Sequence, residues 1–275
     1  MRLFKAKKKN IKLITIEGEI KSSTEGKFGE SRQSQIDLLD KLYDIAEDDK
    51  IHGCILRLDS PGGAAGTSEE IYQAVKYIAE NKPVIASIGN LGCSGAYLIA
   101  CAANKIIATK MAFVGSIGVI MMLPNFSKAK DKVGVDMVII KSGKMKDVGN
   151  MFRDMQDEER KLLEDLAHEC HEDFIHIVEE GRKNLKDGYK ELLDGRILST
   201  STALDYGFID EIGTYQDAIE AMADELDVDV EKLNIIKDKK KTGLIGKLLS
   251  LSCDNIATLL SEKIINTATS TKYFK

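Results

Sequence analysis

The chain has 275 residues, of which 43% are apolar, and a formal net charge of −5. This length holds one large domain or two small ones, and the apolar content supports a sizeable core. The acidic balance argues against a nucleic-acid partner, because a domain that binds phosphate backbones is expected to be basic.

The cysteines are irregularly spaced and form no CxxC pair, so they predict neither a disulfide framework nor a zinc site. They are Cys54, Cys93, Cys101, Cys170 and Cys253.

The N-terminus is basic but leads directly into a short strand-like run at 11–16. No apolar stretch reaches the roughly 18 residues that a membrane-spanning helix needs, and no apolar segment has the character of a secretory leader. Reduced cysteines are typical of the cytosol. We therefore expect a cytoplasmic protein without a signal peptide or transmembrane helix, peripheral at the membrane at most.

Short apolar strands alternate with amphipathic helices along the chain, which is typical of an α/β domain. The expected strands cover residues 12–17, 53–59, 84–88, 105–108 and 137–141. The expected helices cover residues 33–47, 68–80, 95–103, 157–180, 200–206 and 216–225. The long helix carries one apolar stripe at helical spacing. Its members are Leu163, Leu166, Cys170, Phe174, Ile177 and Val178.

The first motif in chain order is Ser-Pro-Gly-Gly at 60–63, which follows the expected strand 53–59. Glycines at such a turn let a backbone N–H approach a ligand oxygen with no side chain in the way. Gly62 and Gly63 are therefore candidates for contacting a substrate oxygen.

Ser94 lies between the expected strand 84–88 and the expected helix 95–103, with Gly92 and Gly95 beside it. A serine at a strand-to-helix turn can project its hydroxyl while the first helical N–H groups point at a substrate. That placement suits a nucleophile next to an oxyanion-binding site. The alternative is an N-cap serine, the commonest role of serine at a helix start. Cys93 is a second candidate nucleophile, but no motif places a histidine near it.

A glycine turn after the expected strand 137–141 carries Lys141, Lys144 and Lys146. A lysine is a general base only when its surroundings lower its pKa from about 10.4 toward neutrality. One of these lysines is therefore a candidate base, and the other two are candidates for solvated turn residues.

These segments closely resemble the signal peptide peptidase A family of serine peptidases, in the family's order and spacing. The resemblance runs from about residue 12 to residue 218. It rests on Ser-Pro-Gly-Gly at 60–63, Cys-Ser-Gly-Ala-Tyr-Leu-Ile-Ala-Cys at 93–101, Val-Gly-Ser-Ile-Gly-Val-Ile at 114–120, Lys-Ser-Gly-Lys-Met-Lys-Asp at 141–147 and Asp-Gly-Arg-Ile-Leu-Ser at 194–199.

The resemblance implies a Ser–Lys dyad without histidine, metal or cofactor, in which Ser94 is the nucleophile and Lys146 the general base. The backbone N–H groups of Gly62 or Gly63, together with that of Gly95, fall where the family forms its oxyanion hole. The implied fold is α/β of the Clp-protease/crotonase type, a superhelix of strand–strand–helix repeats. The implied activity is endopeptidase cleavage of hydrophobic peptides such as signal-peptide remnants.

No internal repeat is visible, so the chain corresponds to the single-domain form of the family. Relatives of that form assemble into homo-oligomeric rings, in which the lysine of one protomer completes the serine site of its neighbour. The sequence departs from the family's usual motifs at two places, which affect the shape of the expected pocket and any hydroxyl that orients the lysine. Cys93 and Ala96 replace an alanine and a glycine of the usual Ala-Ser-Gly-Gly-Tyr, and Asn150 and Met151 stand where the family tends to have Ser-Pro before Phe-Arg.

Two alternatives share the fold. An acyl-CoA enzyme of the crotonase type uses a glycine-built oxyanion hole but needs no Ser–Lys pair. A catalytically inactive scaffold binds peptides without cleaving them. Labelling of Ser94 by a serine-reactive fluorophosphonate distinguishes both from a peptidase.

We divide the chain into a peptidase domain, 1–236, and a C-terminal tail, 237–275. The tail begins with a basic linker and continues with apolar residues at helical spacing. These residues are Ile245, Leu249, Cys253, Ile256, Leu260 and Ile264, flanked by Lys247 and Lys263. Because the polar face is only mildly basic, we expect this helix to pack on its own domain or a neighbouring subunit, with a membrane surface as the alternative.

Overall fold

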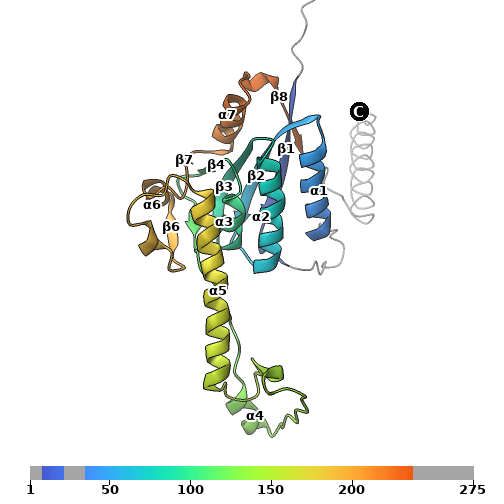
Figure 1. The fold of residues 1–275 in the computed structure, drawn as a ribbon, viewed down its shortest axis with the longest axis vertical. Coiled ribbons are helices and arrows are strands. Elements are labelled where there is room, and N and C mark those ends of the chain that lie inside the picture. The colour runs from blue at the N-terminus through green and yellow to red at the C-terminus, as the bar shows by residue number, and fades with distance from the viewer. Residues whose placement is uncertain (1–7, 22–34, 238–275) are drawn as a thin grey trace, which may run out of the picture.

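The computed structural model describes residues 8–21 and 35–237. The predicted C-terminal helix lies outside the described residues, as does most of the basic linker before it. The described part is a mixed sheet flanked by helices, from which one long helical arm extends (Figure 1).

Within the described residues, eight strands form a single sheet with the order β6-β5-β3-β2-β1-β8, to which β4 is added through β3, and β7 through β4. Their bounds are β1 Lys9–Glu17, β2 Ile51–Ser60, β3 Val84–Cys93, β4 Lys105–Ala108, β5 Phe113–Gly115, β6 Ile197–Ser199, β7 Glu211–Ile212 and β8 Leu233–Lys237. The β5–β6 pair is antiparallel and the other pairs are parallel. Central parallel strands are covered on both faces, which explains the nearly continuous apolar runs of β2 and β3.

The helices are α1 Gln35–Glu47, α2 Ala65–Ala79, α3 Gly95–Ala100, α4 Ser127–Val133, α5 Asp157–Gly181, α6 Thr200–Asp205 and α7 Tyr215–Glu225. Short 3₁₀ helices cover Lys144–Asp147, Tyr189–Leu192 and Val230–Lys232. Helices α1, α2 and α3 pack on one face of the sheet in the larger core cluster, and α7 covers the other face.

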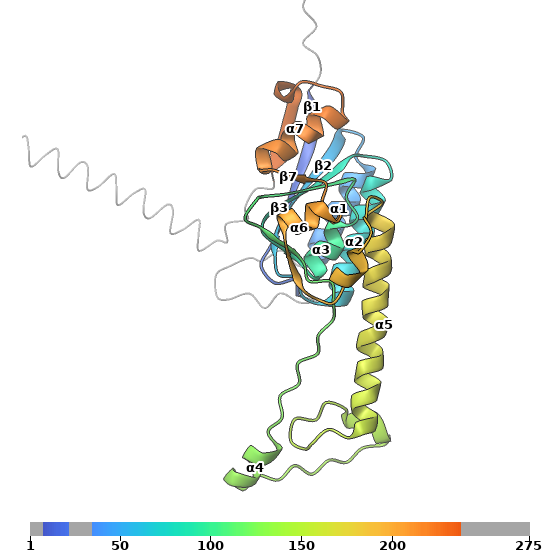
Figure 2. The same cartoon turned by 90° about the vertical axis from the view of Figure 1, so that its left-hand side faces the viewer.

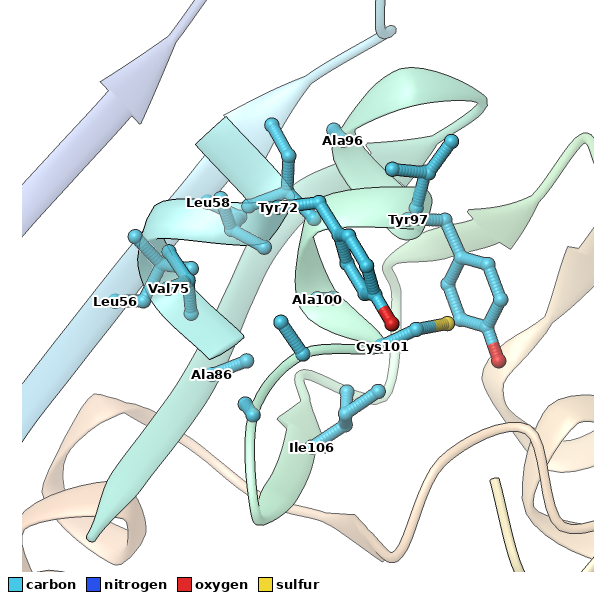
Figure 3. Packing of buried hydrophobic residues seen from close by; sticks show 14 of the residues in the cluster. Leu56, Leu58, Tyr72, Val75, Ala86, Ala96, Tyr97, Ala100, Cys101 and Ile106 are labelled. Carbon is cyan, nitrogen blue, oxygen red and sulfur yellow. The ribbon is translucent and has the colours of Figure 1, made fainter. Parts of the chain in front are cut away.

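The larger core lies between the central strands and helices α2 and α3 (Figure 3). Leu56 and Leu58 of β2 point toward Tyr72 and Val75 of α2 there. Tyr97 of α3 is fully buried, and its hydroxyl donates to the carbonyl of Phe208 at 2.7 Å. This packing fixes α3, and with it the turn that precedes α3, against the sheet.

Strand β3 has two successive neighbours on one side, β4 along its first part and β5 at its end. Residues 85–88 pair with β4, and residues 91–93 pair with β5. The carboxyl end of β3 therefore lies where the path of the sheet changes from one neighbour to the next. In open α/β sheets, ligands bind at such points outside the carboxyl ends of the strands.

The arm consists of residues 118–170 and lies away from the sheet (Figures 1 and 2). An extended segment runs out from β5 to α4, and α5 returns to the domain. At about 1.5 Å per residue, the 25-residue α5 is roughly 37 Å long. Among the described residues, the larger core cluster has no fully buried member between Ile117 and Phe174.

Most predicted elements are confirmed within a few residues, but one predicted strand is wrong. Residues 137–141 form no strand, because this segment lies on the arm with Val138 and Ile140 exposed and no partner strand among the described residues. The apolar stripe of α5 is covered only near its C-terminal end, where Phe174 and Val178 are buried, while Leu166 is exposed.

Candidate active site

Ser94 occupies a strained turn between β3 and α3. Its φ is +51° and its ψ −127°, and its backbone N–H donates to the carbonyl of Gly115 at 2.7 Å. A non-glycine residue at positive φ costs about 1–3 kcal/mol and is typical of functional turns. Ser94 is the N-cap residue of α3 by position, but its hydroxyl makes no capping hydrogen bond to the helix, so capping does not account for this serine. Ser94 is partly exposed although Cys93 and Gly95 beside it are buried, which leaves its hydroxyl accessible.

The Ser-Pro-Gly-Gly turn lies directly against the Ser94 turn. A Cβ added to Gly62 would lie 2.7 Å from the backbone nitrogen of Gly95 and 2.8 Å from Ser94 Cβ. A Cβ on Gly95 would lie 2.2 Å from the hydroxyl oxygen of the buried Ser68. Both glycines are therefore required by close approach of neighbouring atoms.

The two turns bring free backbone donors together. Gly62 N–H donates to Ser60 Oγ at 3.1 Å and so is occupied. Gly63 forms a parallel bridge with Ile20. The two hydrogen bonds of this bridge are made by the residues on either side of Gly63, so the N–H of Gly63 itself is directed away from Ile20. Within residues 8–21 and 35–237, the N–H groups of Gly63 and Gly95 have no acceptor. Two adjacent free donors beside a hydroxyl can bind an oxyanion.

A second strained residue, Ser116, borders the same site. Its φ is also +51°, and it directly follows Gly115, whose carbonyl accepts the Ser94 N–H. The residue after Ser116 is the buried Ile117, and its carbonyl oxygen lies 3.1 Å from Nε2 of His171 on α5. In the sequence, Ser116 is visible only as part of the motif Val-Gly-Ser-Ile-Gly-Val-Ile at 114–120. The glycines on both sides of Ser-Ile in this motif are the sequence signal that indicates a turn here.

Cys93 does not have the character of a nucleophile. Its thiol is buried and lies 3.5 Å from the carbonyl of Phe113. Burial raises its pKa above the ordinary cysteine value. A protonated, enclosed thiol is unreactive, which leaves the Ser94 hydroxyl as the accessible nucleophile at this turn.

Lys146 lies on the arm, and the structure does not bring it to Ser94 of the same chain. The 3₁₀ helix Lys144–Asp147 is joined to the start of α5, the end remote from the sheet. Lys141 pairs with Asp147, and Lys144 pairs with Glu158 of α5. For the exposed Lys146, the described part of the chain offers no ion-pair partner. Of these lysines, Lys146 therefore has the amine that is available to another group.

The described residues contain no cluster of histidine, cysteine or carboxylate side chains arranged to hold a metal ion. Nor does any helix in residues 8–21 and 35–237 combine the length and apolar character needed to cross a membrane.

The comparisons with known proteins show to which family this fold and site belong. The model of Peptidase family S49 matches residues 76–229, more than half of the chain. The chain belongs to this family, which confirms the resemblance noted above.

A protein of Methanocaldococcus jannaschii named "Putative protease MJ0651" is 33% identical over 222 residues, which cover 81% of this chain and 71% of that protein. The "Serine protease SPPA, chloroplastic" of Arabidopsis thaliana is 32% identical over 229 residues, 83% of this chain but only 33% of that longer protein.

Among solved structures, the 1510-N membrane-bound stomatin-specific protease superposes with a TM-score of 0.50 at 16% identity. The match covers 85% of this chain and 99% of that one. At this identity the likeness concerns the fold alone. The expected α/β fold is confirmed.

Proposed function

We propose that this protein is a serine endopeptidase in which Ser94 is the nucleophile and Lys146 of a neighbouring copy is the general base. The observation that carries the proposal is the Ser94 turn: an accessible hydroxyl on a strained backbone, beside two backbone donors that have no other acceptor. The family membership supports peptide hydrolysis as the reaction.

The mechanism proceeds through an acyl-enzyme. The neutral amine of Lys146 takes the proton from Ser94 Oγ, and Oγ attacks the carbonyl carbon of the substrate. The N–H groups of Gly63 and Gly95 stabilise the oxyanion, and one such donor typically contributes about 3 kcal/mol to transition-state binding. The resulting ammonium gives its proton to the departing amine. Lys146 then activates a water molecule that hydrolyses the ester and regenerates Ser94.

A site shared between subunits follows from where the two residues lie. Ser94 is on the domain, whereas Lys146 is on the arm, which has few contacts with its own domain. The arm also exposes apolar side chains that a subunit interface would cover. They include Ile120, Met121, Met122, Val133, Met137, Val138 and Ile140. We propose a homo-oligomeric ring in which each arm carries its lysine to the next Ser94, and in which the contact removes water from the base.

Hydrophobic peptides in extended conformation are the proposed substrates. The short strand β5 ends beside Ser94, and the segment after it has no strand partner among the described residues, so a peptide can align along it. Signal-peptide remnants have this character.

Cys54, Cys93, Cys101 and Cys170 are free thiols, which supports the proposed cytoplasmic location.

A fluorophosphonate that reacts with activated serines tests the proposal. We expect labelling of the wild type at Ser94, no labelling of Ser94→Ala, and labelling of Lys146→Ala slowed by at least about 100-fold. Lys144→Ala is the matched control, because it removes a lysine of the same turn, and it should label at the wild-type rate. An unlabelled wild type would favour an inactive peptide-binding scaffold, and equal losses in the two lysine variants would exclude a specific role for Lys146.

A further inference from the structure

Arg153 joins the turn that carries Lys146 to the first turn of α5. Its Nε lies 3.0 Å from Oδ2 of Asp147, and its Nη1 lies 2.7 Å from Oε2 of Glu159. Its Nη2 donates to the backbone carbonyl of Asp147 at 3.2 Å and also to Oε1 of Glu159. One guanidinium therefore connects the residue after Lys146 to helix α5. We call this group, Asp147–Arg153–Glu159, the arginine clamp.

Both carboxylates of the arginine clamp have additional partners. Glu159 is only 2% exposed and accepts the backbone N–H of Gln156 at 3.0 Å, which completes the capping box of α5. Asp147 also pairs with Lys141. The Arg153 guanidinium lowers the pKa of Glu159 to about 2, aided by the Gln156 N–H. It also lowers the pKa of Asp147, aided by Lys141. Both carboxylates are thus ionised at neutral pH.

Polar contacts have to fix the Lys146 turn, because no fully buried core residue of the larger cluster lies on the described arm. The other ion pair between this turn and α5, Lys144–Glu158, joins side chains that are 67% and 57% exposed. Such exposed pairs contribute little. A guanidinium that binds carboxylates with several N–H groups fixes distance and orientation together, which a lysine cannot do. The arginine clamp is therefore the contact best able to hold the turn in one position.

We propose that Arg153 is the positioning residue of the general base: by joining Asp147 to Glu159, it holds Lys146 where its amine can take the proton of a neighbouring Ser94. This inference rests on the Ser94–Lys146 mechanism proposed above. A displacement of about 1 Å at a reacting group can cost about 100-fold in rate. Loosening the clamp therefore slows the chemical step more than it weakens substrate binding.

Steady-state kinetics of Arg153→Gln and Arg153→Lys measure this effect. We expect kcat of Arg153→Gln to fall by about 10- to 100-fold while KM changes less than about threefold. Arg153→Lys should be intermediate, since it keeps the charge but not the forked geometry. The control Lys76→Gln breaks the pair between Lys76 and Glu180 at the other end of α5, 2.7 Å long, and should stay within about twofold of wild type. A kcat of Arg153→Gln within about twofold of wild type would overturn the proposal.

Mixed oligomers separate positioning from a general loss of structure. The first mixture combines Ser94→Ala/Arg153→Gln chains with Lys146→Ala chains, so each rebuilt site takes its lysine from a chain without the clamp. The reciprocal mixture combines Ser94→Ala with Lys146→Ala/Arg153→Gln, so each rebuilt site takes its lysine from an intact clamp. The two mixtures contain the same substitutions, and only their distribution differs.

We expect the reciprocal mixture to match a plain Ser94→Ala plus Lys146→Ala mixture, and the first mixture to be about 10- to 100-fold slower. Equal rates in the first and reciprocal mixtures would overturn the role of Arg153. An inactive plain mixture despite proven subunit exchange would instead disprove the shared site. In that case, the kcat comparison of Arg153→Gln with Lys76→Gln decides the role of Arg153 within a single chain.

Discussion

At the scale of single residues, the site depends on two serines with unusual backbone angles and on two glycines at which the neighbouring chain leaves no room for a side chain. Ser94 and Ser116 have the same positive φ and lie at neighbouring strand ends, while Gly62 and Gly95 leave room for each other's turns. Strain in two adjacent turns persists only where the surrounding packing fixes it. The fully buried α3 residues beside Ser94 provide that packing.

Ser94→Ala should abolish peptidase activity, because it removes the attacking oxygen. The substitution deletes one partly exposed hydroxyl that caps nothing, so circular dichroism and the unfolding temperature should stay close to wild type. Loss of a nucleophile costs far more than about 10³-fold in other serine peptidases. Turnover within about tenfold of wild type would rule out Ser94 as the nucleophile.

Activity should rise with pH, because a lysine base acts only as the neutral amine. The activity is present above the apparent pKa of the base and lost as pH falls through it. The measurement is kcat/KM against pH with a peptide substrate, and a flat profile from about pH 6 to about pH 10 would count against a lysine base.

Gly95→Ala should reduce activity by at least about tenfold and destabilise the fold by about 1–3 kcal/mol, because the new methyl group overlaps the buried Ser68 and pushes α3 from α2. Gly66→Ala is the control, since a Cβ there meets open space on an exposed helix. That variant should be neutral, or more stable by up to about 1 kcal/mol. Urea unfolding and peptide turnover measure both effects, and two variants with the same behaviour would contradict the close packing at Gly95.

The residue types around Ser94 made its turn predictable, because small residues after an apolar run restrict the local backbone. The roles of Gly62 and Ser116 were less accessible to sequence reasoning. Gly62 donates to Ser60, so Gly63 is the residue of the pair with a free N–H. Ser116 approaches Ser94 only because β3 pairs with β5, and this pairing is a long-range contact that local pattern does not specify.

At the scale of elements, α5 has two differently built ends. Its N-terminal end holds the Lys146 turn through the arginine clamp, and its C-terminal end packs on the domain through Phe174 and Val178. Arg182, the residue after α5, is 4% exposed and pairs with Asp210 at 2.5 Å. The attachment of the arm to the domain therefore combines apolar burial with a buried ion pair.

Arg182→Ala should lower the free energy of unfolding by about 3 kcal/mol, because it removes the buried guanidinium and leaves the half-buried Asp210 carboxylate with the Ile106 N–H but without its charged partner. Lys76→Ala removes the exposed Lys76–Glu180 pair, which also links α5 to the domain, and should cost less than about 1 kcal/mol. Urea unfolding at one fixed protein concentration compares them. Equal losses in the two variants would show that the Arg182 pair does not anchor α5.

The arm itself was not predictable from pattern. Residues 137–141 have the apolar, β-branched composition of a strand, but a strand needs a neighbour, and the chain places this segment away from the sheet. The apolar stripe on α5 is present as predicted, but its N-terminal half has no cover within the described chain. Both observations have the same cause: sequence periodicity reports which side chains favour burial, not which partner buries them.

At the scale of the whole molecule, one chain holds both members of the proposed catalytic pair but keeps them apart. The domain supplies Ser94 with its backbone donors, and the arm supplies Lys146 with exposed apolar side chains around it. An assembly that covers these side chains would also remove water from the lysine, which is the condition for its action as a base. Oligomer formation and activity should therefore depend on each other.

The most direct test of the shared site mixes two inactive variants. Ser94→Ala and Lys146→Ala chains, each inactive alone, are combined under conditions that allow subunit exchange, and peptide cleavage is measured. Sites that combine an intact Ser94 from one chain with an intact Lys146 from the other should restore activity in proportion to the mixed interfaces. A mixture that stays inactive after proven exchange, or a dilute monomer that cleaves peptides at the full rate, would contradict a site built from two copies.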